Sequence, residues 1–318
     1  MKRGINILAT TYLATATLAW CSVPVFIKHF TRYFDHYTQN AYRYGVAALL
    51  WTPVLWWLWR RGLAPRRLWR QALVPVVCNI IGQTFWALAL YYLNPGFMSL
   101  CMRISLVWAI IFAMLVFRDE RPLLRSVRFW LGVVVGLVGA AGVIGFSDDF
   151  SWQARDLMTG LLVVLGCSIF WAGYMVGVRW KMGHVSSLVA FPIIAVSTAI
   201  GLVGLMLVFG EPAAIATAPP SVVFWLVLSA IVGIGISHVF YYAAMRRLGA
   251  AICAGTLEVV PFLTLGLSWL VFGETLNGQQ WLSGAILLAG TGVLIWAQRD
   301  VHVGHRPPEP DSQEPTPS

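Results

Sequence analysis

The chain has 318 residues, of which 58% are hydrophobic and only 11% are charged, with a formal net charge of +9. So few charged residues cannot cover the surface of a water-soluble protein of this size, and the composition excludes an ordinary soluble fold. The positive charge does not indicate a nucleic-acid-binding protein, because membrane proteins concentrate Lys and Arg on one side of the bilayer.

Ten apolar segments follow one another along the chain, separated by charges, prolines, glycines or polar clusters. A helix needs about 20 apolar residues to cross ~30 Å of hydrocarbon. The predicted spans are residues 6–26, 40–59, 72–92, 96–117, 127–147, 157–178, 187–209, 222–242, 251–272 and 279–297. The Pro-rich residues 301–318 are predicted to form a disordered cytoplasmic tail. We therefore expect an all-α integral membrane protein with ten transmembrane helices.

The positions of Lys and Arg predict the orientation of these helices. With a cytoplasmic N-terminus, seventeen of the 22 Lys and Arg fall at cytoplasmic positions. Arg103 falls inside a segment, and four residues are counted with the outer loops: Lys28, Arg32, Arg43 and Arg155. This bias predicts a multi-pass protein of the cytoplasmic (inner) membrane with both termini in the cytoplasm.

The two halves of the chain resemble each other weakly. Trp20 and Lys28 have counterparts in Trp171 and Arg179, each 151 residues later, and the shift elsewhere varies up to 155. We interpret residues 1–150 and 151–300 as two five-helix repeats. Because five is an odd number of crossings, the second repeat must be inverted relative to the first. Secondary transporters use this architecture and bind their substrate near the midplane between the repeats.

Four polar residues are predicted to lie at that midplane: Gln83, Arg103, His238 and Glu258. Each lies about 8–10 residues from a turn, which corresponds to ~12–15 Å along a helix. A buried charge needs a partner or a wet cavity, so we expect Arg103 to face Glu258. This pair either binds substrate or is a structural ion pair, and Gln83 and His238 leave the same alternatives open.

Four tryptophans fall deeper in the segments than the interfacial ones: Trp20, Trp86, Trp108 and Trp171. They are candidates for the wall of a substrate cavity, with ordinary core packing as the alternative. The sequence contains no phosphate-binding loop, no HExxH, no Gly-x-Ser-x-Gly and no metal-ligand spacing. We therefore expect no enzymatic activity, no cofactor and no metal ion.

Five stretches together resemble the EamA-type members of the drug/metabolite transporter superfamily, which have ten helices in two repeats. The stretches are WCSVPVFIK from Trp20, YRYGVAALL from Tyr42, FWALALYYLNPG from Phe85, RDERPLLRSVRFWLGVVVGLVGAAGVI from Arg118, and FGETLNGQQWLSGAILLAGTGVLI from Phe272. The resemblance implies transport of a small metabolite or xenobiotic across the cytoplasmic membrane, often outward. It also implies a cavity formed by helices one, three, four, six, eight and nine. Glu120 and Glu274 match loop glutamates of the family, and we interpret them as helix-end or gate residues.

The resulting hypothesis is a secondary transporter, an exporter that works by alternating access. Its substrate would be a xenobiotic or a small metabolite, for example a zwitterion such as a hydrophobic amino acid. Arg103 would hold the carboxylate, and Glu258 would hold the amine or carry a coupling proton. A homodimer is left open. The alternatives are an exchanger of sugar phosphates or nucleotide sugars, a membrane-embedded enzyme, and a channel.

Overall fold

The computed structural model describes residues 7–118, 121, 125–146, 155–248, 253, 256–257 and 259–303. This part of the chain is almost entirely helical and contains no strand. The first five crossings are α1 (Ile7–Phe30), α2 (His36–Arg60), α3 (Arg66–Tyr92), the composite of α4 (Pro95–Cys101), η1 (Met102–Ile104) and α5 (Ser105–Val116), and α6 (Val127–Gly145). The other five are α7 (Arg155–Met182), α8 (Ser187–Phe209), the composite of α10 (Pro220–Ala230), η3 (Ile231–Ile236) and α11 (Ser237–Leu248), then α13 (Val260–Phe272) and α14 (Gly278–Val303), with a short α9 (Ala214–Thr217) before α10.

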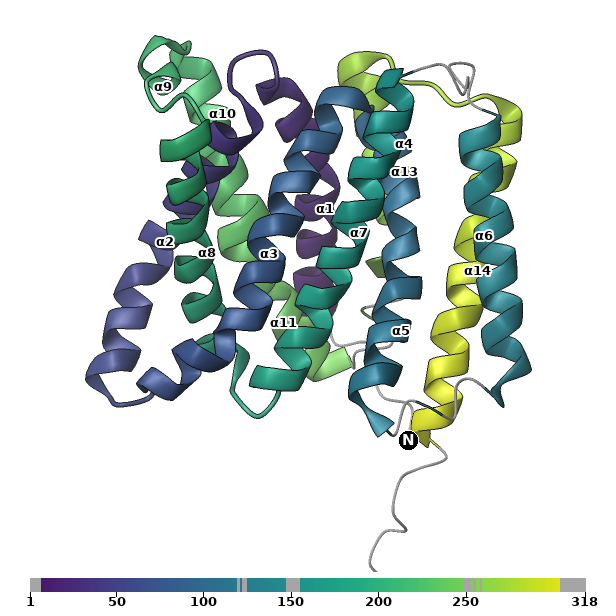
Figure 1. The fold of residues 1–318 in the computed structure, drawn as a ribbon, viewed down its shortest axis with the longest axis horizontal. Coiled ribbons are helices and arrows are strands. Elements are labelled where there is room, and N and C mark those ends of the chain that lie inside the picture. The colour runs from purple at the N-terminus through teal and green to yellow at the C-terminus, as the bar shows by residue number, and fades with distance from the viewer. Residues whose placement is uncertain are drawn as a thin grey trace, which may run out of the picture.

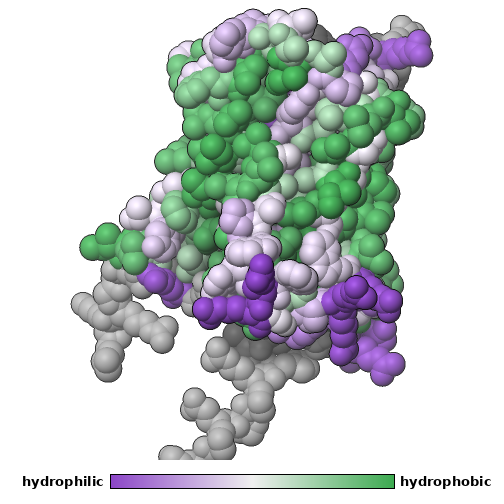
Figure 2. Space-filling model, turned by 90° about the vertical axis from the view of Figure 1, so that its left-hand side faces the viewer, coloured by the Kyte–Doolittle hydropathy of each residue, from purple (hydrophilic) through white to green (hydrophobic). Residues whose placement is uncertain are grey.

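The predicted all-α membrane fold is confirmed by these helices. Eight helices in the described part are long and apolar enough to cross a bilayer, and Val260–Phe272 is a shorter apolar helix. A hydrophobic band separates hydrophilic ends on the face of the molecule where α2 and α8 lie (Figure 2). Exposed apolar side chains of these two helices, such as Leu49 and Leu207, contribute to the band. Such a band is what contact with lipid tails requires.

Local sequence sets the ends of several helices. The Asp35 carboxylate caps α2 by accepting hydrogen bonds from the backbone N–H groups of Tyr37 and Thr38, at 2.8 and 2.9 Å. A proline begins both α4 and α10, where its missing N–H costs nothing. Gly273 ends α13 with a φ of 72°, a left-handed conformation that glycine adopts without strain.

Three of the four cations that were counted with the outer loops lie within helices, and Arg155 is the first residue of α7. Lys28 belongs to the last part of α1, and Arg43 lies well inside α2, which begins at His36. Arg43 is only 1% exposed. Arg43 therefore belongs to the helix, as the predicted span 40–59 implies, and its count among the outer loops was wrong.

The packing of the helices has the symmetry of two inverted repeats. The second helices of the two repeats, α2 and α8, pack against each other, and so do the fifth helices, α6 and α14. These two pairs lie at opposite ends of the molecule in Figure 1. Between them, α3 packs on α7 as α11 packs on α1, and α5 packs on α7 as α13 packs on α1. Exchanging the repeats therefore reproduces the same set of contacts, as a pseudo-two-fold axis in the membrane plane requires.

The varying shift between the repeats has a simple origin in their loops. Helices α2 and α8 begin 151 residues apart, at 36 and 187, and so do α6 and α14, at 127 and 278. The connection between α8 and α10 contains α9 and is longer than the α2–α3 turn, which raises the shift for the third crossing. The connection from α5 to α6 is longer than that from α13 to α14, which restores the original value.

Glycines allow α6 and α14 to approach closely. A Cβ on Gly132 would lie 2.9 Å from the backbone nitrogen of Leu294, and one on Gly290 would lie 2.9 Å from the carbonyl oxygen of Gly132. Small residues permit such backbone contact between membrane helices. These glycines therefore serve a contact within the chain.

The turn between α3 and α4 is tied to the second repeat by Glu274. The Glu274 carboxylate is buried and accepts hydrogen bonds from the backbone N–H groups of Gly96 and Phe97, at 2.9 and 2.8 Å. Lys28 donates from its ammonium to the carbonyl oxygens of Leu90 and Leu93, at 2.9 and 3.0 Å. Opposite charges thus satisfy the two helix ends that meet at this turn. Glu120, the matching residue of the first repeat, lies outside the described residues.

Candidate functional site

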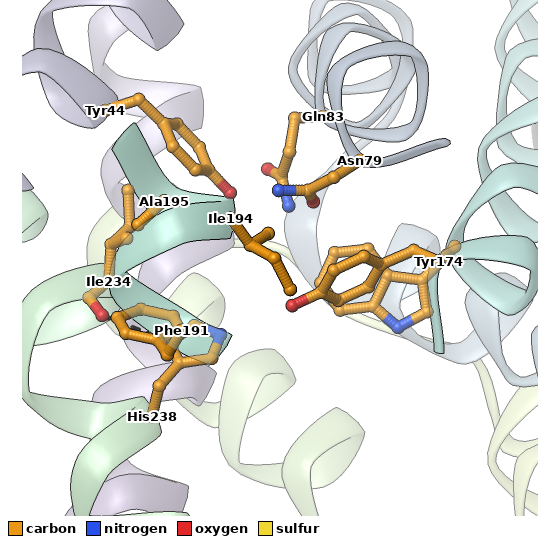
Figure 3. A pocket seen from close by; sticks show the side chains of 10 residues that line it. Tyr44, Asn79, Gln83, Tyr174, Phe191, Ile194, Ala195, Ile234 and His238 are labelled. Atoms are coloured by element: carbon orange, nitrogen blue, oxygen red, sulfur yellow. Dashed lines mark hydrogen bonds between the residues drawn. The ribbon is translucent and has the colours of Figure 1, made fainter. Parts of the chain in front are cut away.

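A small cavity lies between the two repeats, and the centre of a water molecule can occupy about 10 Å³ of it. Six elements contribute side chains to it: α2, α3, α7, α8, η3 and α11 (Figure 3). The lining residues in the described part are Tyr44, Asn79, Gln83, Trp171, Tyr174, Phe191, Ile194, Ala195, Ile234 and His238.

The lining includes residue pairs that the repeat relates. Gln83 and His238 are 155 residues apart, as are Asn79 and Ile234, and Tyr44 is 151 residues before Ala195. The cavity therefore lies on the pseudo-two-fold axis. In each pair the two side chains differ in chemistry, so the walls of the cavity are symmetric in backbone and asymmetric in polarity.

Amides and a phenol make one wall of the cavity polar. The Tyr44 hydroxyl points toward the amide groups of Asn79 and Gln83 (Figure 3). The Asn79 amide donates to the Thr198 hydroxyl at 3.0 Å. The backbone carbonyl of Gln83 accepts from the side-chain amide of Asn40 at 2.6 Å. These bonds fix Asn79 and the backbone of α3 at the wall, which positions hydrogen-bonding groups for a bound molecule.

The opposite wall is built around His238. Its ring stacks on Phe191 with centroids 4.8 Å apart, and the edge of Trp20 approaches it at 5.2 Å. Nδ1 lies 3.1 Å from the carbonyl oxygen of Ile234, one helical turn earlier. Because a carbonyl oxygen only accepts, Nδ1 carries the hydrogen of the neutral ring and Nε2 is the acceptor. His238 thus combines an aromatic face with one polar atom.

Aromatic pairs support both walls in a symmetric way. Trp171 stacks on Trp86 with centroids 5.8 Å apart, and Trp20 contacts Tyr241 at 4.9 Å. Trp20 and Trp171 are equivalent at the shift of 151, and Trp86 and Tyr241 at the shift of 155. Each pair packs the first helix of one repeat against the third helix of the other.

The structure brings some of the sequence-predicted residues together and not others. Gln83, Trp171 and His238 line one cavity, while Trp20 contacts the ring of His238 and Trp86 contacts that of Trp171. The cavity residues not singled out from the sequence are Tyr44, Asn79, Tyr174, Phe191, Ile194, Ala195 and Ile234. The shift of 151 residues between α2 and α8 relates Tyr44 to Ala195, so comparing these two helices would have pointed to both residues.

Arg103 and Trp108 lie elsewhere. Arg103 lines a second hollow with Gly136 of α6 and Thr291 of α14, separate from the cavity that contains His238. Trp108 packs against Phe112 with ring centroids 6.3 Å apart. Glu258 lies outside the described residues, so its proximity to Arg103 remains a prediction. Among the described residues no group of three His, Cys, Asp or Glu side chains could hold a metal ion.

The comparisons with known proteins agree with this architecture. The model of the EamA-like transporter family matches the chain twice, over residues 7–145 and 158–296. An uncharacterised transporter of Methanothermobacter thermautotrophicus is 23% identical over 214 residues, which is 62% of this chain and just over half, 56%, of the relative's length. A protein of known crystal structure superposes with a TM-score of 0.61 at 19% identity, covering 92% of this chain and 98% of its own, and at this identity the likeness concerns the fold alone. The two matches of the family model, one on each repeat, show that this chain belongs to the EamA-like transporter family.

Proposed function

We propose that the protein is a secondary transporter that exports a small organic solute by alternating access of its two repeats. The observation that carries this proposal is the position of the cavity, which is lined by residue pairs that the repeat relates. A site on the axis between inverted repeats is reached from either side of the membrane when one repeat rocks against the other.

The lining favours a zwitterion with an apolar or aromatic side chain, such as a hydrophobic amino acid. Trp171, Tyr174 and Phe191 offer flat apolar surfaces, while Asn79 and Gln83 offer amide groups for a polar end. Exchangers of sugar phosphates need several cations at the site, and no Lys or Arg lines the cavity among the described residues.

The environment of the transporter follows from the charge distribution. Exposed Arg60, Arg61, Arg66 and Arg67 at the α2–α3 turn support a cytoplasmic location for that turn in the inner membrane, and hence for both termini. His238 and Glu258 are the candidates for carrying a coupling proton. A homodimer would need a surface other than the glycine contact of α6, because α14 occupies it.

Untargeted metabolite profiling of culture medium tests the proposal. Cells that express the wild-type chain are compared with cells that express His238→Leu, Glu258→Gln or a lipid-facing control, Leu207→Ala. We expect one compound to accumulate outside with the wild type and the control, and to be reduced with His238→Leu. Equal release by all variants would remove His238 and Glu258 from the mechanism. Profiles identical to those of empty cells would contradict export.

A further inference from the structure

Arg43 is a buried cation without a counter-charge among the described residues. Its side chain is 1% exposed, and its Nε donates to the hydroxyl of Ser229 at 3.1 Å. That hydroxyl is neutral and itself donates to the carbonyl oxygen of Leu226 at 2.8 Å. No carboxylate of the described part bonds to the guanidinium. Burying a charge in a membrane is costly unless a partner or function maintains it.

The equivalent position in the second repeat faces the cavity. Residues 40, 43 and 44 of α2 correspond to 191, 194 and 195 of α8 at the shift of 151. All three of the α8 residues, Phe191, Ile194 and Ala195, line the cavity, whereas only Tyr44 does so from α2. Asn40 and Arg43 are instead turned to protein partners, the carbonyl of Gln83 and the hydroxyl of Ser229.

This difference between α2 and α8 bears on the state that opens to the other side of the membrane in the proposed transport cycle. In secondary transporters built from two inverted repeats, one half rocks against the other around a fixed site, so a side chain turned away from the site in one state can reach it in the other. In that state α2 takes the place that α8 has here. Residues 40, 43 and 44 then line the cavity, and residues 191, 194 and 195 turn into protein contacts.

We propose that Arg43 enters the cavity in the opposite-facing state and there binds the anionic group, a carboxylate, of the transported solute. The inference rests on the proposed transport function and replaces Arg103 with Arg43 as the anion anchor. A substrate carboxylate supplies the counter-charge that Arg43 lacks among the described residues, through a charge-assisted hydrogen bond.

Unused hydrogen-bond acceptors on the same helix suit the amine of a zwitterion, which can donate to them while Arg43 holds the carboxylate. The side-chain oxygens of Gln39 and Asn40 are buried and accept no hydrogen bond in the described part. Both residues are fully buried, one turn from Arg43 and Tyr44. Buried polar atoms are rarely left without partners. These acceptors are thus available to a polar ligand or to water when α2 turns toward the cavity.

Sided labelling of cysteines tests the exchange of α2 and α8 directly. Arg43→Cys and Ile194→Cys are each exposed to a membrane-impermeant maleimide in right-side-out and in inside-out vesicles, with the wild-type chain as the background for its five native cysteines. A second pair, Asn40→Cys and Phe191→Cys, covers the case in which loss of Arg43 prevents folding. We expect the α2 position of each pair to react from one face and its α8 partner from the other. Reaction of both from the same face, or of neither α2 position from any face, overturns the proposal.

Variants of Ser229, the hydrogen-bond partner of Arg43, distinguish a binding role of Arg43 from a structural one. Ser229→Ala removes the same hydrogen bond without removing the charge, so a merely structural Arg43 would make Ser229→Ala and Arg43→Gln equivalent. We expect release of the carboxylate-bearing compound to fall about tenfold or more with Arg43→Gln, and to persist with Arg43→Lys and Ser229→Ala. If the wild type exports a compound and Arg43→Gln exports it equally, this inference fails alone. If the wild type exports nothing, the proposed function fails, and the labelling result still tests the movement of α2.

Discussion

Replacing Glu274 should destabilise the protein by an amount that its contacts determine. In Glu274→Ala, the buried N–H groups of Gly96 and Phe97 lose their acceptor. Leaving a buried donor without a partner costs about 1–3 kcal/mol, and bonds to charged groups lie at the upper end of this range. Two such losses amount to about 3–5 kcal/mol. For a chain of this size, that loss lowers the apparent melting temperature by about 5–10 °C.

The assay is thermal unfolding of the purified protein in detergent, followed by the fraction that remains soluble and monodisperse. Glu274→Gln, which keeps one acceptor oxygen, should lose about half as much stability as Glu274→Ala. Glu211→Ala is the matched control, because the Glu211 side chain is exposed and only its backbone N–H is bonded. A melting temperature for Glu274→Ala within about 1 °C of the wild type would refute the reasoning, since the turn would then have other means to satisfy its donors.

Three further outcomes are expected. Gly139→Val should prevent stable packing of α6 on α14, since a Cβ there meets the backbone of Leu287, whereas Gly145→Val meets nothing within 4 Å and should leave the melting temperature unchanged. At Asp35, burial raises the pKa, but hydrogen bonds from the Thr38 hydroxyl and from three backbone N–H groups outweigh it, so the net pKa lies below its usual value. Such a carboxylate stabilises the fold above the unfolded-state pKa of about 4 and loses that contribution as the pH falls through the folded value. The melting temperature of Asp35→Asn should therefore lie below that of the wild type at pH 7, and the gap should close in acid. Trp171→Ala should reduce export of the compound identified by profiling about tenfold while Trp171→Phe retains most of it, and equal export by both would remove this ring from the site.

The hydropathy of the segments and the odd number of crossings in each repeat were sufficient to predict the fold. Each of the ten predicted spans overlaps an observed helix or composite crossing, because crossing a bilayer fixes both the length and the composition of a segment. The beginning of α2 was missed by four residues, since residues 36–39 and the Asn40 and Arg43 that follow are polar or only weakly apolar. That polarity is compensated by contacts with α3 and α10, which hydropathy cannot detect.

The sequence singled out some residues of the candidate cavity and could not indicate which side of a helix each residue faces. Gln83 and His238 were expected near the midplane, and both line the cavity. Arg103 was placed by the same depth argument, yet it faces α6 and α14. It lies in η1, a 3₁₀ turn with about 3 residues per turn, so its direction around the fourth crossing differs from that in a continuous α-helix, a change that we call a rotation. Sequence spacing assumes a continuous α-helix and therefore cannot give this rotation.

The pairing of cavity residues across the axis has a consequence for how such a transporter can evolve. In a symmetric dimer of five-helix chains, one mutation would change both walls of the site at once. In this single chain each wall changes separately, and positions 79 and 234 already differ as Asn and Ile. In the alternating-access cycle proposed above, selection could therefore strengthen binding in the state open to one side without strengthening it in the other. The ratio between the affinities of the two states for the solute would then depend on which residues occupy the paired positions and could change while the helical scaffold stays the same.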